Sequence, residues 1–209
     1  MQHEAGFCDL AMHIDKDILI GCRKGDRRSQ FRLYELCYPY LMGVALRYRK
    51  QQEEAASAVN MAFLKILNHL DRFRENHSFK GWMRQIMVNT LIDEYRRTSR
   101  FSSESTAVDY EKEVALNGVH VDYNHAETNL NVEQLVSYIH ELNPLTASVF
   151  NMYVLDGFPH KDIASMLAIS EAASKWHLFT ARKQLQEMVE KASGKITNQI
   201  EPKIKVNPV

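Results

Sequence analysis

The chain reads KDIASMLAISEAASKWHLFTARKQL from residue 161 to residue 185. The first seven of these residues predict a two-turn helix, residues 168–170 predict a short turn, and Ser170 is placed to cap a second helix. One face of that second helix is formed by Ser174, Leu178, Ala181 and Leu185. Two short helices joined at this spacing predict a helix-turn-helix.

The opposite side of the second helix is a candidate DNA-binding surface. A basic-flanked outer face on the second helix of such a pair suits the DNA major groove. We therefore expect contacts with duplex DNA from Ala173, Lys175, Trp176, His177, Thr180 and Arg182. The alternative is a structural helical hairpin in which Trp176 is exposed incidentally.

Outside this motif, helical periodicity extends over most of the chain, and Gly and Pro are scarce, at 8 and 5 of 209 residues. Helices are expected over residues 15–24, 27–50, 53–70, 81–100, 132–142, 145–155, 161–167 and 171–191. We expect an all-α protein of two small helical domains joined by a flexible linker, the second a helix-turn-helix domain. The expected division is a flexible amino terminus (1–14), a first helical domain (15–100), an acidic linker (101–130), a second domain (131–192) and a disordered tail (193–209).

The net charge is zero, from 26 basic and 26 acidic residues, but the charge is unevenly distributed. Residues 1–100 carry 17 Lys and Arg against 12 acids, and residues 101–130 carry 1 against 6. Bulk charge therefore does not indicate a nucleic-acid-binding protein, whereas the basic first half permits one.

The helix expected over residues 81–100 has one polar stripe on an apolar body. Aromatic and amide groups beside cations suit unstacked single-stranded bases, which need a stacking surface and edge hydrogen bonds. The stripe consists of Trp82, Gln85, Asn89, Asp93, Arg96 and Arg97, and the preceding loop adds Phe73, Arg74, Asn76, His77, Phe79 and Lys80. The alternative is a solvated face with Phe73 and Phe79 in the core.

Two segments carry a family resemblance. The run FKGWMRQIMVNTLIDEYRR (79–97) resembles the promoter-melting segment of bacterial RNA polymerase sigma factors. The run DGFPHKDIASMLAISEAASKWHLFTARKQL (156–185) resembles their final helix-turn-helix, and the short layout is similar to the extracytoplasmic-function (ECF) group. By position, Asn89, Asp93, Arg96 and Arg97 match the melting helix. Lys175, His177 and Arg182 fall where the family usually has Lys, Arg and Arg.

The resemblance implies a polymerase-docking surface on the helix expected over residues 53–70. In the family this helix usually carries an acid and then glutamine-glutamate before a Phe, whereas here Ser57, Asn60 and Met61 precede Phe63. A face separate from the expected core positions Val59 and Ile66 is shared by Glu53, Ser57, Asn60, Met61 and Leu64. An exposed Met and Leu predict a docking surface that is more apolar than usual.

The resemblance further implies a sigma factor that binds the RNA polymerase core and directs promoter recognition, DNA melting and transcription initiation. The first domain would dock on polymerase and capture bases of the minus-ten element, and the second would bind the minus-thirty-five element. Promoter DNA and an anti-sigma factor are the other implied partners. The alternatives are a helix-turn-helix regulator whose first domain is a sensor or dimerisation module, and a helical enzyme.

Enzymatic motifs are absent from the sequence, which has no Walker loop, no GxSxG and no HExxH. We expect no catalytic residue, metal or cofactor; His120 and His125 near Asp122 are expected to be solvated rather than metal ligands. No run of 18 apolar residues occurs, so we expect no membrane insertion. Cys8, Cys22 and Cys37 are expected to be reduced thiols in the cytoplasm.

Overall fold

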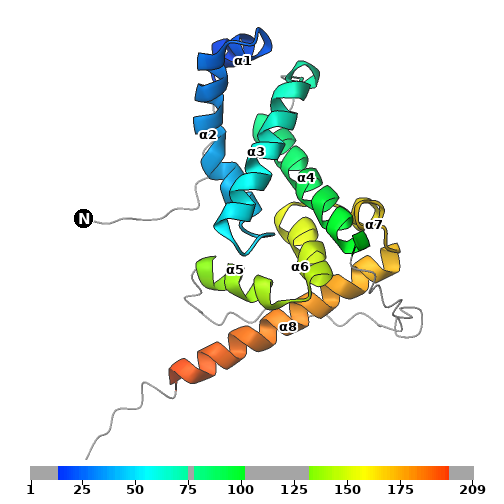
Figure 1. Ribbon diagram of the computed structural model, residues 1–209. Coiled ribbons are helices and arrows are strands. Elements are labelled where there is room, and N and C mark those ends of the chain that lie inside the picture. Colours follow the sequence, from blue (N-terminus) through cyan, green and yellow to red (C-terminus); the bar gives the residue numbers. More distant parts are fainter. Residues whose placement is uncertain (1–13, 75–77, 102–131, 198–209) are drawn as a thin grey trace, which may run out of the picture. The chain divides into compact units, whose positions relative to one another are not determined.

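The computed structural model describes residues 14–74, 78–101 and 132–197. Within these ranges all regular secondary structure is helical, which confirms the predicted all-α class (Figure 1). The chain separates into two compact units between Ser99 and Arg100. The expected flexible amino terminus and nearly all of the expected acidic linker lie outside the described residues.

The first unit consists of α1 (Lys16–Arg23), α2 (Arg27–Ala45), α3 (Gln52–His69), the short 3-10 helix η1 (Leu70–Arg72) and α4 (Phe79–Phe101). Two aspartates begin the first two helices: Asp15 accepts a hydrogen bond from the backbone N–H of Asp17, and Asp26 from that of Ser29. These caps satisfy backbone donors that a helix leaves unpaired at its start. Gly25 allows the sharp turn between the helices because its φ is +77°.

The core of the first unit lies between α2, α3 and α4. Its completely buried side chains include Leu33, Leu41, Val59, Ile66, Met83, Met87 and Val88. The expected core positions Val59 and Ile66 of α3 are buried, as is Phe63 between them, so the helical periodicity placed this face correctly. Cys37 is also buried among these helices, and burial raises the pKa of its thiol to about 12.

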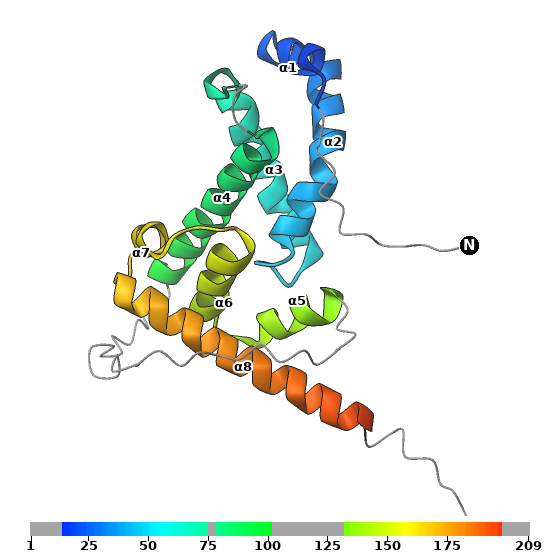
Figure 2. The same cartoon turned by 180° about the vertical axis from the view of Figure 1, so that it is seen from behind.

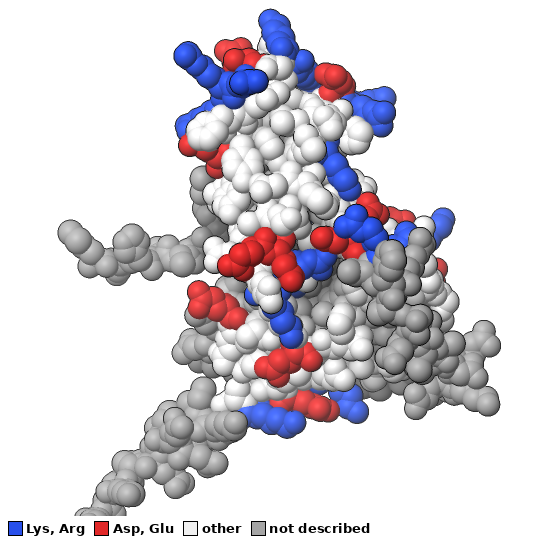
Figure 3. Space-filling view, in the orientation of Figure 1, with Lys and Arg blue, Asp and Glu red and all other residues white. Residues whose placement is uncertain are grey.

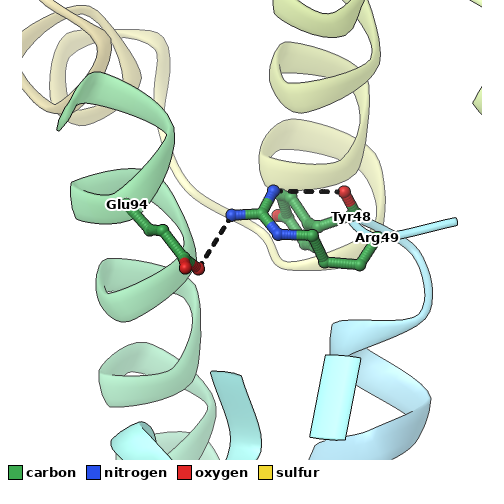
Figure 4. Close-up of polar contacts among 3 residues, drawn as sticks. All are labelled: Tyr48, Arg49 and Glu94. Carbon is green, nitrogen blue, oxygen red and sulfur yellow. Dashed lines mark hydrogen bonds and ion pairs between the residues drawn. The ribbon is translucent and has the colours of Figure 1, made fainter. Parts of the chain in front are cut away.

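An ion pair joins α4 to the segment between α2 and α3. Arg49 donates to Glu94 at 3.0 Å from its Nη2 atom, and its Nη1 atom lies 3.4 Å from the carbonyl oxygen of Tyr48 (Figure 4). Both charged side chains are less than one-third exposed. Partial burial strengthens the attraction, so this contact fixes the carboxyl-terminal half of α4 against the α2–α3 connection.

The second unit consists of α5 (Val132–Glu141), α6 (Pro144–Phe150), the π-helical turn η3 (Asn151–Leu155), α7 (His160–Leu167) and α8 (Glu171–Thr197). Asn143 caps α6 by accepting from the backbone N–H of Leu145, and Pro144 occupies the first helical position. Both α6 and α7 pack against α8. The core includes Ile139, Val149, Met152, Ile163 and Ala181.

The predicted helix-turn-helix is formed by α7, the turn at residues 168–170 and α8. Ser170 Oγ accepts from the backbone N–H of Ala173 at 3.0 Å, which confirms the predicted cap. The expected disordered tail began at Ser193, but α8 continues through Thr197, so that boundary was wrong. A single glycine at position 194 costs a helix only about 1 kcal/mol relative to alanine, which is too little to end it.

Candidate functional site

The polar stripe predicted on α4 lies on its exposed side. Gln85, Asn89 and Asp93 recur every fourth residue and are all exposed, and Arg97 is exposed one turn further on. Lys65 of α3 lies beside the stripe, with its Nζ atom 3.4 Å from Asp93 Oδ2. The stripe therefore presents amide, carboxylate and guanidinium groups that are able to hydrogen-bond to base edges and phosphates.

Three aromatic rings form a cluster at the amino-terminal end of α4. The ring centroids of Phe73 and Phe79 are 5.0 Å apart with perpendicular planes, and Trp82 lies 5.3 and 5.5 Å from them. Phe73 and Phe79 are buried, with exposed fractions of 8% and 9%, so the expectation that these two rings stack on DNA bases is corrected. Their faces are occupied by each other and by Trp82, which remains half-exposed.

The polar residues predicted in the loop before α4 differ in their exposure. Arg74 is exposed at the end of η1. Lys80 sits at the start of α4, where its Nζ atom lies 5.2 Å from the ring centroid of Tyr40. The two remaining predicted loop residues, Asn76 and His77, lie outside the described residues.

All five residues of the predicted docking face on α3 are exposed: Glu53, Ser57, Asn60, Met61 and Leu64. Met61 is 40% exposed and Leu64 is 60% exposed. Asn60 Oδ1 accepts a hydrogen bond of 2.8 Å from the hydroxyl of Tyr34, whose ring packs edge-on against Phe63. This docking face is therefore solvent-exposed, combines polar residues with the apolar Met61 and Leu64, and is bordered by α2.

The outward face of α8 differs from the predicted one. Lys175 and Arg182 are exposed, and Trp176 and Thr180 are half-buried. Ala173 and His177, which we expected on the DNA-binding face, are both only 3% exposed and belong to the core. The outward face instead includes Ala172 and Phe179, the latter 37% exposed.

The packing of two helices against α8 accounts for this correction. The sequence analysis assigned a single buried face to α8, the one that packs on the first helix of the motif. In the structure both α7 and α6 pack against α8, so more of its circumference is buried. His177 Nδ1 lies 2.9 Å from Thr146 Oγ1 of α6. The small side chain of Ala173 beside the expected core face was the sequence signal for this wider buried side, whereas nothing local indicated that His177 is buried.

Each helix of the helix-turn-helix contains a histidine whose surroundings favour the neutral ring. His160 of α7 stacks on Tyr153 at 4.4 Å between ring centroids, and its Nδ1 atom lies 2.9 Å from Ser174 Oγ. Burial lowers the pKa of His160, as do the nearby cations Lys175 and Arg182, against an opposing effect of Glu171. Burial also lowers the pKa of His177.

Among residues 14–74, 78–101 and 132–197, no group of three or more His, Cys, Asp or Glu side chains is arranged to hold a metal ion. Across the same ranges, the structure contains no helix with the length and apolarity needed to span a membrane. The two linker histidines, His120 and His125, and the neighbouring Asp122 lie outside the described part of the chain.

The architecture is that of a helical protein whose second unit contains a helix-turn-helix, a common DNA-binding motif, and whose first unit exposes a polar and cationic helix. Residues 33–101 match the family model for sigma-70 region 2, and residues 133–185 match the model for sigma-70 region 4. Together the two matches span more than half of the chain. The chain belongs to the sigma-70 family of RNA polymerase sigma factors.

Curated relatives agree with this assignment. The chain is 23% identical over 192 residues to the RNA polymerase sigma-H factor of Pseudomonas aeruginosa, a match that covers 87% of this chain and 96% of that protein. It is 20% identical over 168 residues to the ECF RNA polymerase sigma factor SigE of Mycolicibacterium smegmatis. The latter match covers 80% of this chain and 61% of that relative.

Two solved structures are also similar. The first is the sigma factor RpoE in complex with the anti-sigma factor NepR from Bartonella quintana, at 18% identity and a TM-score of 0.48, covering 76% of this chain and 95% of that chain. The second is CnrH in complex with the cytosolic domain of CnrY, at 17% identity and a TM-score of 0.45, covering 85% and 97%. As a sigma factor, the chain binds RNA polymerase and directs it to promoters.

Proposed function

We propose that the two units divide the work of promoter recognition. The first unit binds the polymerase core and captures unpaired bases of the minus-ten element, and the second binds the minus-thirty-five element as duplex. The observation that supports this division is the exposure of Gln85, Asn89 and Asp93 along one side of α4, next to the half-exposed ring of Trp82. Such a surface can bind the bases of a single strand, whereas the second helix of a helix-turn-helix fits the major groove of duplex DNA.

Strand opening follows from preferential binding of flipped bases. Extruding a base costs a few kcal/mol, and stacking it on an aromatic ring returns about 1–3 kcal/mol. Trp82 provides the half-exposed ring, and Phe73 and Phe79 pack against it. Amide groups of Gln85 and Asn89 can then hydrogen-bond to base edges that are inaccessible in paired DNA.

Polymerase binding is assigned to the docking face of α3. Met61 and Leu64 supply exposed apolar area, and Glu53 is the single charged member of the set. Apolar side chains at the centre of an interface contribute most to its affinity, because their burial removes them from water. We propose that these two residues compensate for the charged groups that the family usually has here.

The minus-thirty-five surface is assigned to the exposed side of α8. Lys175, whose Nζ atom lies 3.2 Å from Glu171, and Arg182 can contact phosphates or guanine edges. Phe179 and Ala172 are the exposed apolar side chains of this face, and apolar groups in the major groove contact thymine methyl groups. Trp176 and Thr180 complete the surface at its edge.

Catalysis, location and a protein partner complete the proposal. The family consists of non-catalytic transcription initiation factors, and we propose that this chain likewise has no enzymatic activity and acts in the cytoplasm, where polymerase is found. Family membership supports a partner of the anti-sigma class, of the kind bound in the Bartonella quintana complex.

The decisive experiment is run-off transcription of fragmented host genomic DNA, with purified host core polymerase and sequencing of the transcripts. Transcripts that start at defined sites only when this chain is added support the proposal, and aligning those sites gives the promoter sequence. A chain that leaves core polymerase unchanged but binds a duplex sequence by itself would be the helix-turn-helix regulator instead.

A further inference from the structure

The α1–α2 turn lies at the same end of the first unit as the amino-terminal end of α4 with Trp82, which we call the base-capture end. The helices α2 and α3 pack against each other and are joined by only residues 46–51, so they run antiparallel and the start of α2 lies beside the end of α3. The helix α1 packs against η1, and Arg23 Nε lies 3.9 Å from Asp71 Oδ1. Both views show α1 at this end (Figures 1 and 2).

The α1–α2 turn and the start of α2 are rich in basic residues. Residues 23–32 contain five Lys and Arg and one acid, Asp26. The carboxylate of Asp26 is engaged by both the backbone N–H and the hydroxyl of Ser29, at 2.9 and 2.6 Å. Figure 3 shows many Lys and Arg side chains, with some Asp and Glu side chains between them, over the end of the first unit where α1 lies, above a broad uncharged surface.

Helix stability does not account for these cations. Arg27 and Arg28 occupy the first turn of α2, which holds no acidic residue, and positive charge at a helix amino terminus is unfavourable. Both side chains are exposed, as is Lys24. Phe31, one turn further along the same side, is 65% exposed, the largest fraction among the large apolar side chains of the described residues.

We propose that Lys24, Arg27, Arg28 and Phe31 form a second single-strand-binding surface, the basic end surface, which binds the unpaired DNA strand where it leaves the base-capture end. The inference rests on the proposed minus-ten function of α4. Arginine and lysine would bind the phosphates, and the exposed ring of Phe31 would stack on a base. These residues precede the region-2 match, which begins at residue 33.

The direction of the strand follows from the proposed function. The minus-thirty-five element is bound as duplex, so the promoter upstream of the captured bases is paired, and a strand that stays unpaired beyond the base-capture end runs downstream. The basic end surface would bind this downstream strand, and Arg74 is a further exposed cation of the first unit.

The test uses holoenzyme and fork-junction probes made from a promoter found by run-off transcription. The short probe carries the minus-ten element as a single strand and lacks the minus-thirty-five element; the long probe adds about six unpaired downstream nucleotides. A K24Q/R27Q/R28Q variant is compared with a K161Q/K183Q/K191Q variant, which removes the same charge from exposed positions of the second unit.

We expect wild-type holoenzyme to bind the long probe more tightly than the short one, and the first triple variant to lose about fivefold or more of affinity for the long probe only. The slope of the logarithm of the binding constant against the logarithm of the salt concentration should become shallower by about 2. Each single-strand phosphate contact contributes about 0.7 to this slope, and the variant removes three cations. The control variant should match wild type. Unchanged binding of the long probe, or an equal loss in the control, overturns the proposal.

Two further measurements distinguish strand binding at the basic end surface from protein binding there and from a failure of the minus-ten function. An F31S variant should weaken binding of the long probe about fivefold without changing how strongly that binding depends on salt concentration, because stacking involves no counterion release. If the triple variant instead loses affinity for core polymerase, the surface binds protein and the proposal is wrong. If N89A and W82A leave the short probe unaffected, the proposed minus-ten function fails independently of the basic end surface.

Discussion

Thr146 and His177 lie on different helices of the second unit, and Thr146 Oγ1 is 2.9 Å from His177 Nδ1. Burial lowers the pKa of His177 below its ordinary value of 6.5, so folding favours the neutral ring. The stabilisation is complete above pH 6.5 and is lost as the pH falls below it, since the unfolded chain then binds more protons. The melting temperature of the second unit should therefore decrease between pH 7.5 and pH 5.

An H177Q variant tests this assignment in the full-length protein. Glutamine does not titrate, so the decrease in melting temperature with acid should become smaller. It should not vanish, because the pKa of His160 is also lowered, by burial and by Lys175 and Arg182. An H177Q protein that loses as much stability as wild type between these pH values would show that His177 does not contribute.

Phe179 is expected to determine part of the minus-thirty-five specificity. An F179A variant should weaken binding to the preferred duplex and relax the preference at one thymine, because the methyl contact is lost. The loss should not exceed the cost of one mismatched base pair, about 1–3 kcal/mol. Folding should be little affected, since the ring is 37% exposed. Competition binding against single-base-pair variants of the promoter is the measurement. An A173S variant, changed in the core, should leave the preference intact.

The docking face should be separable from the DNA-binding stripe. An M61K/L64K variant should weaken core-polymerase affinity about tenfold or more, since burying one such side chain contributes about 1.5–3 kcal/mol. A V132K variant, changed at an exposed apolar residue of the second unit, is the matched control. An N89A variant should bind core normally but fail to open promoters. Equal defects in both assays for both variants would contradict the assignment of faces.

The aromatic cluster should be primarily structural at Phe73. An F73A variant should lower the free energy of unfolding of the first unit by about 3 kcal/mol, as is typical for a buried ring. A W82A variant should lose less stability and more promoter opening, because its ring is half-exposed. Chemical denaturation and permanganate footprinting of the opened strand measure the two effects.

Arg49 should stabilise the first unit through Glu94. Both side chains are partly buried and 3.0 Å apart, so an R49A variant should lower the free energy of unfolding by about 1–2 kcal/mol, between the values of exposed and buried pairs. An R32A variant, which breaks the exposed Arg32–Glu35 pair, should cost less than about 0.5 kcal/mol. Similar losses in the two variants would argue against a special role for the α4 contact.

Local sequence was sufficient for the helices, their caps and the exposed stripes. Asp15, Asn143 and Ser170 cap the helices they precede, because capping depends on a side chain and backbone donors only two or three residues away. The docking face on α3 is exposed as expected, and so is the stripe on α4 except for Trp82 and Arg96, which are half-exposed. Each of these helices has a core side that is evident from its own periodicity.

The sequence by itself determined an all-helical chain, the helix-turn-helix and the family. Only the tertiary structure decided that Phe73 and Phe79 are buried against each other and that His177 and Ala173 belong to the core. It also placed the cations of the α1–α2 turn beside the base-capture end of α4. Periodicity describes one helix at a time, whereas burial depends on how many neighbours pack against that helix and from which sides.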